Sequence, residues 1–177
     1  MIVNIQRKIK IKTTDFMPFL IALEAGVAEV KGKHFSVAFV SDKRMTELNK
    51  LFRGKDSTTD VLSFPHEPDE LESVHHLSAS DETKNFMGDI VISLEQAQRQ
   101  AKENKLTLQQ EVKQLILHGA LHLSGYDHES DEGEMNAREL ELREKLLIVV
   151  EIASCVVRPF AEPLDMLLVG VIARKLF

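Results

Sequence analysis

The chain has 177 residues, of which 44% are hydrophobic and 28% are charged. This length suits one domain, and this composition excludes a chain that is disordered throughout. The formal net charge of −6 argues against a protein that coats nucleic acid by bulk charge, although it leaves room for a local basic patch. The single cysteine, Cys155, excludes an intramolecular disulfide and indicates a reducing compartment. Because the N-terminal residues lack the apolar run of a secretory signal, we expect a cytoplasmic protein.

Patterns of apolar residues predict the elements in chain order. Alternation of apolar and polar residues, or a short β-branched run, predicts strands in four regions: 2–12, 35–40, 60–64 and 88–92. Apolar residues at helical spacing predict five helices, each with a candidate N-cap: Thr14 or Asp15, Ser41 or Asp42, Ser93, Thr107, and Asp131. Residues 66–85 are rich in acidic residues and predict a loop.

Strands and helices alternate early in this chain, and helices dominate late. We therefore expect a single α+β domain, in which a mixed sheet of about four strands is packed with helices. Neither Gly-x-Gly-x-x-Gly nor Gly-x-x-x-x-Gly-Lys-Ser/Thr occurs, which removes the main support for a dinucleotide-binding or P-loop protein.

A histidine cluster is the most informative part of the sequence. His118 and His122 are four residues apart, so on a helix their imidazole rings project about 40° apart, on one face. Gly125 lets the chain leave the helix in a tight or left-handed conformation, and the turn can then return His128 as a third ligand. Three nitrogen ligands with an open fourth position are typical of a catalytic zinc site. The sequence therefore predicts a metal site at the end of this helix.

The histidine pair alone is a weak motif, because such pairs also occur on solvated helix faces. The full spacing His-x-x-x-His-x-x-Gly-x-x-His is that of metzincin proteases, and its third histidine favours a metal site. Zinc proteases carry a glutamate directly after the first histidine as general base, whereas this chain has Gly119. The protease base is therefore missing. Asp127 either orients a ligand imidazole or caps the next turn, and four histidines are not predicted as ligands: His34, His66, His75 and His76.

Three blocks of sequence occur in a fixed order: 48–65, with Arg53 and the run Thr59-Asp60-Val-Leu-Ser-Phe-Pro65; Met87-Gly88-Asp89-Ile90; and His118 to His128. Together they resemble the YbeY family of metal-dependent endoribonucleases, which act in ribosomal RNA maturation. The resemblance extends over roughly residues 1–150, which we expect to form the endoribonuclease domain. It implies that His118, His122 and His128 bind one zinc ion per chain. It also implies that Arg53 is needed for RNA cleavage, and we expect His118 to be catalytic as well as a ligand.

A basic stretch is the best candidate for an RNA-binding surface in this acidic chain. It is opposed within its span only by Glu47, and its members are Lys43, Arg44, Lys50, Arg53 and Lys55. A solvated helix face is the common alternative for such a run. Arginine suits a catalytic role, because its planar guanidinium can hold two phosphate oxygens as charge grows in the transition state.

The C-terminal tail, residues 151–177, is apolar and extends beyond the usual end of the family. Its apolar runs are shorter than a transmembrane helix and are interrupted by charged residues, so we expect no stable membrane insertion. Arg158-Pro159 would break a single long helix. Three interpretations remain: a helix packed on the domain, a self-association segment, or a weak membrane association. We favour the first two, since an exposed apolar tail would favour aggregation.

These patterns and the resemblance together predict a zinc-dependent, single-strand-selective endoribonuclease that acts on ribosomal RNA or a ribosomal particle, in rRNA maturation and ribosome quality control. Zinc would lower the pKa of its bound water to about 7, and Arg53 would neutralise the phosphate. Two alternatives stay open. One is a metallohydrolase with a non-RNA substrate, which the protease-like spacing favours and Gly119 opposes. The other is a non-catalytic ribosome-assembly factor in which the metal only stabilises the turn.

Overall fold

The computed structural model describes residues 1–67, 85–127 and 132–157, with the backbone alone for 147–157. Strands, a 3-10 turn and helices follow one another in this order: β1 (Ile2–Asn4), η1 (Thr13–Phe16), α1 (Met17–Gly26), β2 (His34–Val40), α2 (Asp42–Arg53), β3 (Val61–Pro65), β4 (Phe86–Ser93), α5 (Leu94–Glu103), α6 (Leu108–Leu123) and α7 (Glu134–Val157).

The strands form one sheet with the order β1-β2-β4-β3. β1 pairs with β2 and β2 with β4 in parallel, whereas β3 runs antiparallel to β4. The predicted mixed sheet of about four strands in an α+β domain is therefore confirmed. Among the described strands, β3 lies at one edge and has a strand neighbour on one side only, and this edge borders the cavity described below.

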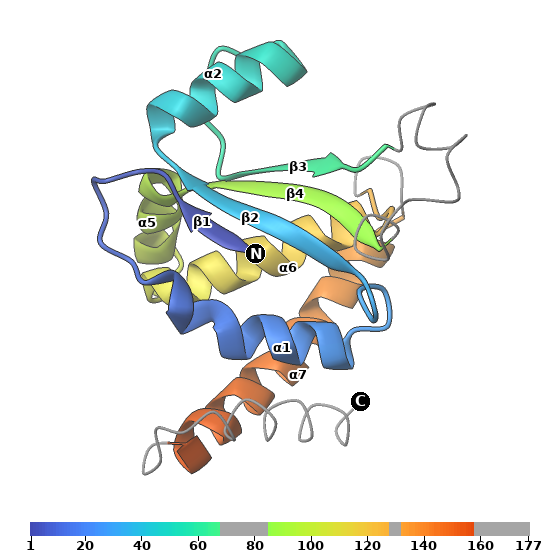
Figure 1. Ribbon diagram of the computed structural model, residues 1–177. Coiled ribbons are helices and arrows are strands. Elements are labelled where there is room, and N and C mark those ends of the chain that lie inside the picture. Colours follow the sequence, from blue (N-terminus) through green and yellow to red (C-terminus); the bar gives the residue numbers. More distant parts are fainter. Residues whose placement is uncertain (68–84, 128–131, 158–177) are drawn as a thin grey trace, which may run out of the picture.

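Helices cover the two faces of the sheet unequally, as Figure 1 shows. α1, α5, α6 and α7 lie on one face, and their apolar side chains bury those of β2 and β4, including Phe39, Ile90 and Ile92. Of the described helices, α2 alone lies on the other face, where Met45 packs in a small cluster with Val40, Leu62 and Val91. Because burial of apolar surface is the main stabilising term, the larger layer fixes the position of α6, the helix that carries the histidine pair.

Capping residues set the start of three helices as predicted. Ser41, Ser93 and Thr107 accept a hydrogen bond from the backbone N–H three residues later, and Thr107 forms a full capping box with Gln110. α2 ends at Gly54, whose φ of 69° is left-handed.

The predicted cap of the first helix is wrong. Neither Thr14 nor Asp15 caps α1; both lie in η1, and Phe16 is the N-cap residue, without a side-chain hydrogen bond. Phe16 is fully buried, so packing of its ring, rather than capping, sets the entry of the chain into α1. The Asp15 carboxylate accepts a hydrogen bond from Gln109 Nε2 at 2.9 Å instead. Asp131, the predicted cap of the last helix, lies outside the described residues, and α7 begins at Glu134.

α7 continues through residue 150 to Val157, across the expected boundary between the domain and the tail. Residues 158–177, most of the predicted tail, lie outside the described residues, as does most of the predicted loop at 66–85. Among the helices of the described part, none combines the length and apolar character needed to cross a membrane.

Candidate active site

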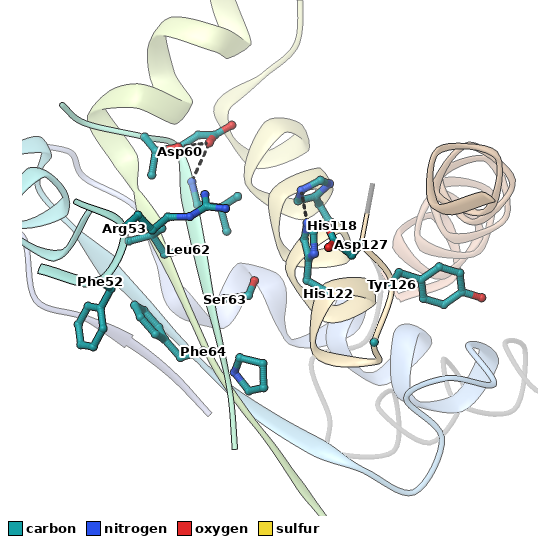
Figure 2. Close-up of a pocket in the computed structure, with 14 residues that line it drawn as sticks. Phe52, Arg53, Asp60, Leu62, Ser63, Phe64, His118, His122, Tyr126 and Asp127 are labelled. Carbon is teal, nitrogen blue, oxygen red and sulfur yellow. Dashed lines mark hydrogen bonds between the residues drawn. The ribbon is translucent and has the colours of Figure 1, made fainter. Parts of the chain in front are cut away.

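A cavity of about 750 Å³ opens between the edge strand β3 and the C-terminal end of α6. Its lining brings together segments that are far apart in sequence: the end of α2, the whole of β3, and the end of α6 with the turn that follows. Arg53, His118 and His122 all line it, as does Asp127 (Figure 2). Three of the four residues predicted for the site therefore share one cavity.

The two histidines of α6 converge at the cavity wall. The Nε2 atoms of His118 and His122 are 3.2 Å apart, and their ring centroids are 4.7 Å apart (Figure 2). Two imidazole nitrogens on one tetrahedral zinc, each at about 2.0–2.1 Å, lie roughly 3.3 Å apart. The observed separation therefore fits a shared metal ion. His128, the predicted third ligand, lies outside the described residues, and within the described residues no three metal-ligating side chains are grouped.

Glu139 of α7 holds the other nitrogen of His118. Its Oε2 lies 3.0 Å from His118 Nδ1, and its Oε1 accepts a hydrogen bond from Arg143 at 2.5 Å. Glu139 is only 5% exposed. Burial opposes its ionisation, but the hydrogen bond from His118 and the charge of Arg143 outweigh this and hold the pKa of its carboxyl below the usual value. A carboxylate that accepts from Nδ1–H leaves the Nε2 lone pair of His118 directed at the cavity, as a metal ligand requires.

Sequence reasoning missed Glu139, although the sequence contains a signal for it. Met135, Leu142 and Leu146 are the buried apolar residues in the part of α7 whose side chains are described, residues 134–146, and Glu139 occupies the same stripe at intervals of three and four residues. A carboxylate on an apolar helix stripe needs a partner inside the protein. The identity of that partner, His118, depends on how α7 packs against α6, which local pattern does not give.

Arg53 is the last residue of α2, directly before the left-handed Gly54. Figure 2 shows its guanidinium on the β3 side of the cavity, opposite the histidines of α6. The cavity therefore has a cation on one wall and two imidazoles on the other. This arrangement suits a phosphodiester, whose charge the guanidinium can neutralise with two hydrogen bonds.

Gly119 lies where a zinc protease has its general base, and the structure shows why a side chain does not fit there. A Cβ atom at this position would lie 2.8 Å from Cγ2 of Ile90, a residue of β4 that is itself fully buried. α6 thus rests directly on the sheet at Gly119. This position faces the core, while its neighbour His118 faces the cavity, so a base at 119 would be directed away from the substrate.

The other described histidines lie elsewhere. His34 and His66 both pack against Phe86, with ring centroids 5.5 Å and 5.4 Å from that of Phe86. Neither lines the cavity. His75 and His76 lie outside the described residues.

The chain matches known proteins over most of its length. Residues 2–147 match the family described as endoribonuclease YbeY. The endoribonuclease YbeY of Nautilia profundicola is 42% identical over 114 residues, which cover 64% of this chain and 73% of that protein. That of Thermodesulfovibrio yellowstonii is 34% identical over 160 residues, which cover 82% of this chain and 93% of that protein.

One solved structure agrees with these matches. The solution structure of TM1509 from Thermotoga maritima aligns with a TM-score of 0.53 at 28% identity, over 82% of this chain and 89% of that one. The family match spans the end of α2, β3 and the end of α6, the elements that line the cavity. The chain belongs to the YbeY endoribonuclease family.

Proposed function

We propose that this protein is a zinc-dependent endoribonuclease that cleaves unpaired RNA in ribosomal RNA maturation and ribosome quality control, in the cytoplasm. The observation that supports this most strongly is the cavity that Arg53 shares with the converging Nε2 atoms of His118 and His122, in a chain of the YbeY family. Ribosomal RNA, free or in a ribosomal particle, is the proposed partner. Self-association through the tail remains a prediction.

The residues that line or support the cavity have separate roles. His118 and His122, with His128, would hold one zinc ion, which supplies Lewis acidity and lowers the pKa of bound water. Glu139 accepts a hydrogen bond from His118 Nδ1–H and so would fix the ring in its ligating orientation. Arg53 would donate to the phosphate oxygens as negative charge develops on them.

Cleavage by one preparation of RNA and of casein tests this proposal. We expect cleavage of single-stranded RNA, weaker cleavage of the same sequence in a duplex, and none of casein, together with one zinc per chain by metal analysis. Cleavage of casein would favour the metallohydrolase alternative. A zinc-loaded, folded protein that cleaves no RNA would favour the assembly factor.

The basic stretch supports a prediction about RNA affinity. Arg44 is already paired with Glu47 at 2.9 Å, and Lys50 with Asp56 at 2.6 Å. Both pairs are exposed and therefore weak, so phosphate can replace the carboxylate. We expect a weaker salt dependence of RNA binding when four cations are neutralised together: Lys43, Arg44, Lys50 and Lys55. The slope of the logarithm of the binding constant against the logarithm of salt concentration should fall by about one unit for each phosphate that the variant no longer binds.

The four cations differ in their distance from Arg53 along the chain. Lys43 lies ten residues from Arg53, about 15 Å along the helix, whereas Lys55 is two residues beyond it. Neutralising Lys50 and Lys55 should therefore lower the slope more than neutralising Lys43 and Arg44. The measurement is a titration of RNA binding at several salt concentrations. An unchanged slope in the quadruple variant would place the RNA surface elsewhere.

Glu139 supports a prediction about metal affinity. Replacing it with alanine should weaken zinc binding about 10- to 100-fold, because His118 is then without the group that orients its ring. Glu139→Gln keeps an oxygen that can accept from Nδ1–H, so its effect should be smaller. Zinc affinity is measured by competition with a chelator.

Glu141→Gln is the matched control for Glu139. Glu141 lies on the same helix but is exposed and pairs with Arg138 and Lys145, away from the histidines. Its replacement should leave zinc affinity unchanged. A folded Glu139→Ala variant with wild-type zinc affinity would show that the contact with His118 does not support the metal site.

A further inference from the structure

Phe52 is an exposed aromatic residue at the mouth of the cavity. It is 59% exposed although it follows Leu48 by four residues on the apolar side of α2. At this end of the helix, the ring of Phe52 packs against an aromatic neighbour on the edge strand of the sheet. That neighbour is Phe64 of β3, with ring centroids 4.8 Å apart and planes at 66°, an edge-to-face contact.

Single exposed apolar residues are common, and exposure alone says little. The surroundings distinguish Phe52 from such residues. Phe52 and Phe64 both line the cavity that contains Arg53 and the histidine pair (Figure 2). The neighbouring Leu51 is 74% exposed but does not line it. Phe64 packs with Leu62 on the α2 face of the sheet, so this aromatic surface lies across β3 from the histidines, on the wall of the cavity that carries Arg53.

Three cations lie close to Phe52 in sequence, and one of them, Lys50, is paired with the exposed carboxylate of Asp56. Arg53 follows Phe52 directly, and Lys50 and Lys55 lie within three residues of it. An apolar surface for a protein partner is typically depleted in lysine at its centre, whereas aromatic rings set among cations are characteristic of single-strand nucleic-acid sites. The cations attract the backbone, and the rings offer a flat surface to bases of any sequence.

We propose that Phe52, supported by Phe64, forms a stacking subsite for one unpaired nucleobase next to the phosphate bound by Arg53. This proposal rests on the proposed function and deepens it, because it names a physical basis for single-strand selectivity. A base can stack on Phe52 only when it is free of its neighbours in a helix. A duplex, whose bases already stack on each other, would reach the cations but not the ring.

A tryptophan reporter tests the subsite directly. The chain contains no tryptophan, so a Phe52→Trp variant carries a single indole that can be excited selectively. Titration with a short single-stranded oligoribonucleotide should quench its fluorescence to saturation, and the same sequence in a duplex should not. Leu51→Trp is the matched control, one residue away and more exposed. Equal quenching in both variants would overturn the proposal, as would equal quenching by duplex and single strand.

A second variant gives a kinetic readout. Phe52→Leu keeps an apolar side chain but removes the flat ring, so single-strand RNA should bind about tenfold more weakly, equivalent to about 1.4 kcal/mol. The KM for cleavage should rise by a similar factor while kcat and zinc content stay at the wild-type level. An unchanged KM would overturn the subsite. Wild-type protein that cleaves no RNA would instead overturn the proposed function, and the fluorescence titration would still decide whether Phe52 stacks on a base.

Discussion

Replacing His122 with alanine is expected to weaken zinc binding by more than about 100-fold and to abolish RNA cleavage. The loss of zinc affinity should exceed the 10- to 100-fold change caused by removing a partner that only orients a ligand, because His122 itself supplies one of the three proposed zinc-ligand nitrogens. The Nε2 atoms of His118 and His122 already converge to 3.2 Å, so little rearrangement is needed to share an ion. Bound zinc is measured by metal analysis after dialysis, with circular dichroism to confirm folding.

Other histidines serve as controls for this prediction. His66→Ala should keep wild-type zinc content, since the His66 ring packs on Phe86 and does not line the cavity. His75→Ala and His76→Ala should do so as well. Stoichiometric zinc in a folded variant with alanine at His118, His122 and His128 would show that the ion is bound elsewhere.

Replacing Arg53 with lysine should lower the turnover of RNA about 10²-fold or more and leave zinc content, folding and most RNA affinity intact. Lysine keeps the charge but cannot donate two parallel hydrogen bonds to a phosphate. If those bonds strengthen only in the transition state, their removal lowers kcat, as does removal of an oxyanion-hole donor. Single-turnover cleavage of an RNA oligonucleotide measures the effect without product release.

Arg44→Lys makes the same chemical change on the same helix. Arg44 is exposed in the first turn of α2 and pairs with Glu47, far from the cavity. The Arg44→Lys variant should therefore turn over RNA at the wild-type rate. Cleavage by Arg53→Lys at the original rate would make Arg53 a positioning contact. A variant that loses zinc or unfolds would reveal a structural role instead.

Local sequence signals are sufficient for the helices whose starts depend on a side chain close in sequence. Ser41, Ser93 and Thr107 cap the N–H three residues later, and these interactions need no information from the rest of the chain. The same signals give the wrong start for α1, because burial of Phe16 in the core overrides the capping preference of Thr14 and Asp15. A tertiary contact decides that boundary.

The candidate site likewise has features that local sequence predicts and features that depend on tertiary contacts. The convergence of His118 and His122 follows from helical spacing alone and is predictable. The contact of Glu139 with His118 spans 21 residues and depends on how two helices pack, so spacing cannot give it. The basic stretch carries less unpaired charge than its sequence indicates, because Asp56 lies just outside its span and pairs with Lys50. In each case, the missing information is the three-dimensional neighbour.

The walls of the cavity come from segments that are far apart in sequence, and this affects the order in which the site assembles as the chain folds. The histidine pair needs only one helix, but Arg53 reaches the same cavity only after β3 has paired with β4 and α6 has packed on the sheet. Such non-local contacts carry the cost of loop closure and form late. A nascent or partly unfolded chain can therefore present the two histidines without the arginine. If cleavage needs both, as proposed, it is restricted to molecules in which the arginine has joined the histidines, and folding intermediates would leave cellular RNA intact.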